Sequence, residues 1–231
     1  MNKKIFVFFI ILISLFLMCM SPESRSVFTF RDVTPTVVID PGHGGFDGGA
    51  VGISGVMEKD LNLEISEKLC DMLTFLGANT HMTRSDDNSV HKEGNTIREK
   101  KVSDIKNRVD SINKIHDAFL ISVHLNHFSM EKYSGAQVFY GKNEASKPLA
   151  VSVQDTLKYG VDNENKRTPQ KAGNVYLLNN VNCPAILVEC GFLSNKKEET
   201  LLKDEDYQRK LAVSIAVGFA NSYKDVLMNE N

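Results

Sequence analysis

The chain has 231 residues, of which 42% are hydrophobic and 24% are charged, and its formal net charge is −2. This length accommodates one domain with a sizeable core, or at most two small domains, and the composition is ordinary for a globular protein. A net charge so close to zero argues against a broad basic face, so no nucleic-acid partner is expected.

The first 20 residues read as a targeting segment. Lys3 and Lys4 precede an apolar run from Ile5 to Met20, which is the pattern of a signal peptide or of an N-terminal membrane anchor. Cys19 also suggests a lipoprotein, although Met18 stands where a small residue is expected. Residues 21–34 form a polar tether. We therefore expect an exported protein, secreted or anchored by its N-terminus, that touches the membrane only through residues 1–20.

The next segment joins a strand to a shaped loop. A run of residues with high β-propensity begins at Thr36 and leads into Asp40–Ala50 (DPGHGGFDGGA). The many glycines of this second segment predict a loop with a defined turn. His43 lies at this break. In α/β proteins sites are built at the carboxyl ends of strands, so His43 is well placed to bind a metal.

The rest of the chain alternates between helical and strand patterns. Apolar residues at helical spacing predict helices, and short apolar runs bounded by turn residues predict strands. This order predicts an α/β fold, a single domain with a mixed twisted sheet of about six strands flanked by helices on both faces. The predicted helices cover 59–77, 98–115, 146–159, 197–202 and 207–226, and the predicted strands cover 36–39, 79–83, 118–126, 136–140, 174–178 and 185–191.

Four side chains with metal-site chemistry lie at or near predicted strand ends or loops, namely His43, Glu58, His124 and Glu189. Two imidazoles and one carboxylate form a common catalytic zinc set, and a further carboxylate can serve as general base. Taken singly, Glu58 is explained by the dipole of the helix that it begins, and His124 by burial in the core. Glu189 is harder to explain, because it follows the apolar run Ala185–Val188 and burying a carboxylate is costly.

Five motifs in a fixed order carry a resemblance to a known family. Over about Val37 to Tyr223 the chain resembles the zinc-dependent N-acetylmuramoyl-L-alanine amidases of bacterial cell walls. The resemblance implies an amidase domain over 35–226 that acts on peptidoglycan, with Zn²⁺ as cofactor. It also implies His43, Glu58 and His124 as zinc ligands and Glu189 as the catalytic carboxylate. The motifs are Asp40–Gly45, Glu58–Leu63, Thr83–Arg84, Ser122–Asn126 and Val188–Asn195.

Strand alternation separates the side chains around these motifs. Asn126 shares a face with His124, so we expect it to orient the ligands or the substrate, whereas His127 falls on the other face. Cys190 is predicted on the face opposite Glu189, in the core. The cysteines are expected to be free thiols.

The compact form and the segment Gly135–Tyr140 resemble the subgroup that acts on spore cortex. This implies removal of whole stem peptides, after which a separate deacetylase permits formation of muramic-δ-lactam, the mark that germination enzymes read. Three alternatives remain open at this point: a vegetative cell-wall autolysin, a zinc peptidase that cuts within the stem peptide, and a non-catalytic peptidoglycan-binding relative.

A partner protein is a further expectation. A shell of three residues binds zinc less securely than a four-ligand structural site, and a secreted or lipoprotein activator could stiffen the loops that carry His43 and Glu58. The alternative is a self-sufficient monomer.

Overall fold

The computed structural model describes residues 34–229 of the chain. The predicted targeting segment, and the predicted tether up to residue 33, lie outside this range. Among the residues described, no helix is long and apolar enough to cross a membrane.

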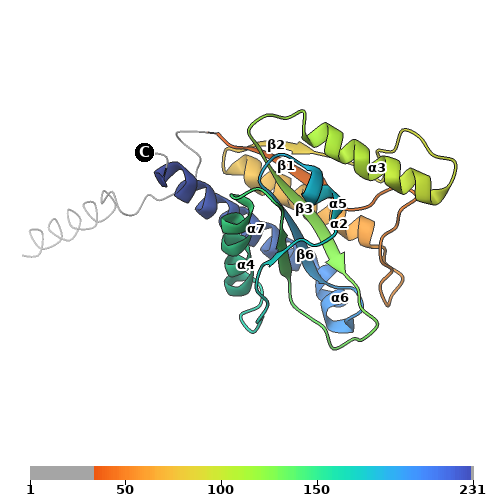
Figure 1. Ribbon diagram of the computed structural model, residues 1–231. Helices are drawn as coiled ribbons and strands as arrows, with labels where there is room; N and C mark the ends of the chain where they lie inside the picture. Colours follow the sequence, from red (N-terminus) through yellow and green to blue (C-terminus); the bar gives the residue numbers. More distant parts are fainter. Residues whose placement is uncertain (1–33, 230–231) are drawn as a thin grey trace, which may run out of the picture.

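Six strands form one mixed sheet in the order β2-β1-β3-β6-β4-β5 (Figure 1). The neighbours β2, β1, β3 and β6 run parallel, β4 is antiparallel to β6, and β5 is parallel to β4. The parallel strands bring their carboxyl ends to one edge, and the functional motifs follow those ends. The strands are β1 (Thr36–Pro41), β2 (Asn79–Met82), β3 (Ala118–Asn126), β4 (Gln137–Tyr140), β5 (Gln170–Lys171) and β6 (Ala185–Phe192).

Helices cover both faces of the sheet, and this confirms the predicted fold class. On one face α2 (Glu58–Phe75), α4 (Ser146–Gly160) and α7 (Glu205–Asn229) contribute to the larger apolar cluster. On the other face α3 (Ile97–Ile112) and α5 (Tyr176–Asn180) contribute to a smaller cluster. Figure 1 shows α3 across the sheet from α4 and α7. The short helix α6 (Lys196–Leu202) follows β6.

The alternation of side chains along the strands matches the prediction. In β1, Val37 and Ile39 belong to the larger cluster, while Val38 belongs to the smaller one. In β6, Cys190 is fully buried in the larger cluster, so Glu189 points to the face covered by α3 and α5. The three cysteines within the described range are free, as expected.

The start of α3 is fixed by its sequence. The hydroxyl of Thr96 accepts a hydrogen bond from the backbone N–H of Glu99, and the Glu99 carboxylate accepts one from the N–H of Thr96. This capping box satisfies two N–H groups that the helix leaves without partners. It fixes where the helix begins, and this helix carries Lys101 and Arg108, which contact Asp47 and Pro41 respectively.

One predicted strand is wrong. Residues 174–178 were expected to be extended, but Tyr176–Asn180 forms helix α5, in which the N–H of Asn179 bonds the carbonyl oxygen of Val175 at 3.1 Å. A five-residue apolar run is too short for its periodicity to separate a strand from a buried helical turn. The sixth strand is instead β5, whose two residues are exposed and carry no apolar signal.

Candidate metal centre

Two buried arginines hold the backbone of the loop that follows β1. Arg108, from α3, donates hydrogen bonds to the carbonyl oxygens of Pro41 at 2.8 Å and of His43 at 2.5 Å. Arg84, which follows β2, donates to the carbonyl oxygens of Pro41 at 3.1 Å and of Gly42 at 3.0 Å. Because a buried carbonyl without a donor costs about 1–3 kcal/mol, these bonds select one conformation of the loop.

Arg108 is itself fixed by Asp40, the last acidic residue of β1. Asp40 is 1% exposed and accepts hydrogen bonds from Arg108 at 2.7 Å, from Thr83 at 2.6 Å and from Ser122 at 2.7 Å. Burial alone would raise the pKa of Asp40, but the charge of Arg108 and these donors outweigh it and lower the pKa to about 2. The carboxylate therefore stays ionised and ties β1, β3 and α3 together.

The loop brings three side chains together at the cost of unusual backbone geometry. His43 has a φ of 62°, a region that non-glycine residues seldom adopt. A Cβ on Gly42 would lie 2.3 Å from the His124 ring, and one on Gly49 would lie 2.6 Å from Oε2 of Glu58. Only glycine allows the backbone to pass this close to the site.

His43, Glu58 and His124 converge as the motifs predict. Nε2 of His43 lies 3.2 Å from Oε2 of Glu58, and Nδ1 of His124 lies 3.1 Å from Oε1 of the same carboxylate. The two imidazole rings stand edge to face, with centroids 5.1 Å apart. One ligand atom from each residue falls within 4.8 Å of the others. Two imidazole nitrogens and a carboxylate oxygen at this spacing fit a divalent metal such as Zn²⁺.

Glu58 is the first residue of α2, and its carboxylate is held by main-chain donors. The N–H of Ala50 bonds Oε2 at 2.9 Å, and the N–H of Leu125 bonds Oε1 at 3.0 Å. Burial alone would raise the pKa of Glu58, but the hydrogen bonds and charges of His124 and His43 lower it well below its usual range. Glu58 thus offers a preoriented, anionic carboxylate that could hold a metal ion.

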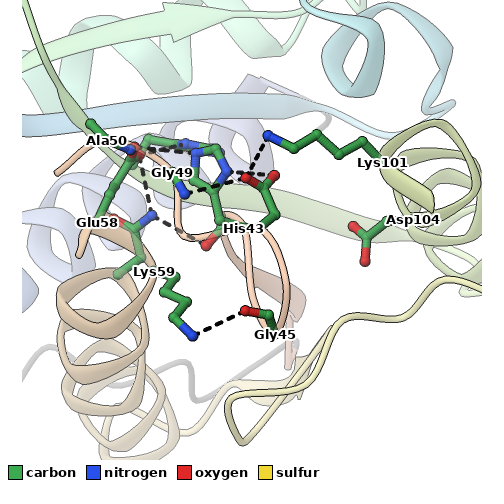
Figure 2. Close-up of polar contacts among 12 residues, drawn as sticks. His43, Gly45, Gly49, Ala50, Glu58, Lys59, Lys101 and Asp104 are labelled. Atoms are coloured by element: carbon green, nitrogen blue, oxygen red, sulfur yellow. Dashed lines mark hydrogen bonds and ion pairs between the residues drawn. The ribbon is translucent and has the colours of Figure 1, made fainter. Parts of the chain in front are cut away.

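The outer nitrogen of His43 is oriented by Asp47. Nδ1 of His43 lies 2.9 Å from Oδ2 of Asp47, which leaves Nε2 to face Glu58. This is the arrangement by which a carboxylate fixes the tautomer of a metal-binding histidine. Figure 2 shows Glu58 on one side of the His43 ring and Lys101 reaching in from α3 on the other. Nζ of Lys101 lies 2.7 Å from Oδ1 of Asp47.

Glu189 lies beside this triad. Its Cα pairs with that of His124 across β3 and β6, and Oε2 is buried with no hydrogen-bond partner among the residues described. Burial raises the pKa of Glu189 to about 7, with the charge on His124 opposing the rise and that on Glu58 adding to it. A carboxyl group with a pKa near neutrality can both accept and donate a proton.

Within residues 34–229, Asn126 and His127 bond to each other and not to the triad. The side chain of Asn126 accepts a hydrogen bond from the N–H of His127 at 2.9 Å, and it makes no hydrogen bond to the triad within the described part of the chain. The role of Asn126 in orienting ligands or substrate therefore stays a prediction.

Sequence reasoning missed the residues that support the triad. Arg108 lies on the apolar stripe of α3 with Ile105, Val109 and Ile112, and a charged residue within such a stripe is a signal of a buried partner. Asn62 was also missed. It is fully buried in α2 and donates to Oε1 of Glu58 at 3.3 Å.

Comparison with known proteins identifies a family of hydrolases. The sequence pattern of the N-acetylmuramoyl-L-alanine amidase family matches residues 37–221. The germination-specific N-acetylmuramoyl-L-alanine amidase of Bacillus subtilis (strain 168) is 40% identical over 191 residues, which cover 82% of this chain and 80% of that protein.

Solved structures agree with the sequence match. The CwlD amidase from Clostridioides difficile, solved in complex with the GerS lipoprotein, is 41% identical with a TM-score of 0.80, and the match covers 83% of this chain and 100% of that one. The amidase AmiC2 of Nostoc punctiforme is 28% identical with a TM-score of 0.71, covering 82% of this chain and 97% of that one.

The geometry predicts that His124 is required for metal binding. His124→Ala should lower the affinity for Zn²⁺ by more than the roughly 10–100-fold typical of a lost supporting residue, because it removes a ligand outright. Competition with a chromophoric chelator measures the affinity. His116→Ala, which removes an exposed imidazole, is the matched control. Full Zn²⁺ affinity in the His124 variant would remove this residue from the site.

Proposed function

The chain belongs to the N-acetylmuramoyl-L-alanine amidase family, and from this premise we propose that it acts as a zinc enzyme. The bond that it hydrolyses is the amide between N-acetylmuramic acid and L-alanine in peptidoglycan. In this proposal His43, Glu58 and His124 hold Zn²⁺. Glu189 is the catalytic acid and base.

A bound Zn²⁺ supplies Lewis-acid chemistry, polarising the scissile carbonyl and lowering the pKa of water. The protein moves the protons. Glu189 takes a proton from the attacking water at Oε2, and it later delivers this proton to the nitrogen that leaves as the amine of L-alanine. The second transfer is needed because an unprotonated amine is a poor leaving group. Asp47 holds the His43 ring in position throughout.

The observation that carries the proposal is the buried Oε2 of Glu189, which has no hydrogen-bond partner among residues 34–229 and lies beside the triad. Burying a carboxyl oxygen without a hydrogen-bond donor is unfavourable, and a passing water or amide nitrogen would supply the missing partner. A non-catalytic peptidoglycan-binding relative would have no use for this group. A peptidase that cuts within the stem peptide would leave L-alanine on muramic acid, so analysis of the products distinguishes the two reactions.

We predict that Glu189→Gln separates catalysis from metal binding. The amide cannot carry the proton, so amidase turnover should fall by the roughly 10²–10⁴-fold typical of a lost general base. Zn²⁺ content and thermal unfolding should match those of the wild type. Release of peptides from purified peptidoglycan gives the rate, and Glu131→Gln, which neutralises an exposed carboxylate, is the control. Near-normal turnover with Zn²⁺ in place would exclude Glu189 from the mechanism.

We propose further that the substrate is the peptidoglycan of spore cortex. The relative from Bacillus subtilis is named as germination-specific, and it matches four fifths of this chain. In this proposal the protein is exported by its N-terminal segment, and it removes the stem peptide before a separate deacetylase acts on muramic acid. The product of the two steps is muramic-δ-lactam. The alternative is a vegetative autolysin.

Spores that lack the gene test whether the substrate is spore cortex. Their cortex should contain no muramic-δ-lactam and should retain stem peptides at the corresponding positions, as seen by mass spectrometry of muropeptides. Complementation with the wild-type gene should restore the lactam, and complementation with the Glu189→Gln variant should not. Normal muramic-δ-lactam content in the deleted strain would indicate that the substrate is the vegetative cell wall instead.

A lipoprotein activator is the remaining part of the proposal. The CwlD structure was solved as a complex with the GerS lipoprotein, and the three-residue ligand set of this chain leaves metal affinity open to improvement by a docked partner.

The proposed activation is tested by titrating the purified protein with Zn²⁺. The titration is run on the protein alone and again in the presence of exported lipoproteins recovered from sporulating cells. The expected result is tighter Zn²⁺ binding and faster turnover in the presence of one of them. Full loading and full activity of the isolated protein, unchanged by any of them, would show that it is self-sufficient.

A further inference from the structure

A cavity of about 190 Å³ adjoins the metal centre on the side of α3 and α5. His43 and His124 form part of its wall, so the cavity is open to a molecule bound at the triad. Lys101 lies at its edge with a side chain that is 49% exposed. The remaining walls come from α3, α5 and the sheet, through residues that include Asp47, Asp104, Ile105, Tyr176 and Leu187.

We propose that this cavity binds the second residue of the stem peptide, and that Lys101 recognises the free α-carboxylate of that residue. The inference rests on the proposed function. It adds the substrate feature that the site selects, a free carboxylate on the residue next to L-alanine. Lys101 is then a specificity-determining residue with no part in the proton transfers.

The three carboxylates that line the cavity, those of Asp40, Asp47 and Asp104, already have partners, Asp40 through Arg108 at 2.7 Å. Both oxygens of Asp104 are already bonded, one to Arg108 at 2.6 Å and one to the N–H of Val90 at 2.7 Å. Asp47 is likewise engaged, by His43 at 2.9 Å and by Lys101 at 2.7 Å. An ammonium group has three donors, and the bond to Asp47 is the one that Lys101 makes among the residues described. Its remaining donors are available to a ligand.

The distances suit a dipeptide. The Asp47 carboxylate contacts both the Lys101 ammonium and the His43 ring. Figure 2 shows Lys101 reaching toward His43. Two extended residues span about 7 Å, which is of the same order as the path from the Lys101 ammonium to the His43 ring through two contacts of 2.7 Å and 2.9 Å with Asp47. The aliphatic part of the bound residue would meet Ile105 and Leu187, which are apolar.

A competing role for Lys101 is to neutralise Asp47 and thereby to position His43. The two roles differ in their dependence on the substrate. A positioning residue affects all substrates alike, whereas a carboxylate-binding residue affects only those whose carboxylate is free.

The test compares two glycan-linked substrates that differ at one group. In one the stem peptide begins L-alanyl-D-glutamyl with a free α-carboxyl, and in the other this carboxyl is amidated. The kcat/KM for each is measured with the wild type and with Lys101→Met, Lys101→Arg and Lys106→Met. Lys106 is exposed on the same helix and forms no ion pair within the described range, so its variant is the matched control. The Zn²⁺ content of every variant is measured in parallel.

We expect the wild type to prefer the free carboxyl by at least about tenfold, as for a charge-assisted hydrogen bond. Lys101→Met should bring this ratio close to one, mainly by slowing the acidic substrate, while Lys101→Arg and Lys106→Met keep the preference.

An equal loss on both substrates in Lys101→Met, or no preference in the wild type, would overturn the subsite and leave the amidase intact. If the wild type cleaved neither substrate between muramic acid and L-alanine, the proposed function itself would be wrong, and the subsite would fall with it.

Discussion

Arg108 donates hydrogen bonds to the carbonyl oxygens of Pro41 and His43 and to the Asp40 carboxylate, from a side chain that is only 2% exposed. The loop after β1 is rich in glycine and holds His43 at a positive φ, so its own conformational preferences do not define its shape. The buried donors fix the conformation of the loop, because carbonyl groups that point into the interior need hydrogen-bond partners. Removing the cation would leave Asp40 as an unpaired buried charge, which is strongly unfavourable.

The sheet places the side chains of the candidate site next to one another. β1, β3 and β6 are adjacent and parallel, so His43, His124 and Glu189 reach the same edge in consecutive positions. Glu58 comes from the start of α2, packed on the opposite face, and binds the N–H groups of Ala50 and Leu125. In the proposed mechanism Glu189, the acid and base, lies one strand from the metal-binding His124 and does not itself bind the metal, which is the separation that hydrolysis requires.

Much of this arrangement could be predicted from the sequence. The strand 118–126 and the long helices were identified because their periodic patterns extend over many residues, and the motifs fixed the family. What was missed depends on tertiary contacts. The helix α5, which walls the cavity with Tyr176, is too short to be distinguished from a strand. Lys101 belongs to the charged, exposed part of α3 and resembles an ordinary solvated lysine. Arg108 lies on the apolar stripe of the same helix, which indicates burial but does not name its partner. The pairing of each with an aspartate becomes visible only when α3 lies against Asp40 and the loop that follows it.

The central claim is that donors from Arg108 to the loop carbonyls hold the metal centre in shape. Zn²⁺ affinity of the double variant Asp40→Asn, Arg108→Met measures this most directly, because it removes the donors without leaving Asp40 as an unpaired buried charge. The account predicts a protein that still unfolds cooperatively but binds Zn²⁺ about 10–100-fold more weakly, as for the loss of other supporting residues of metal sites. Wild-type affinity in the folded double variant would contradict it.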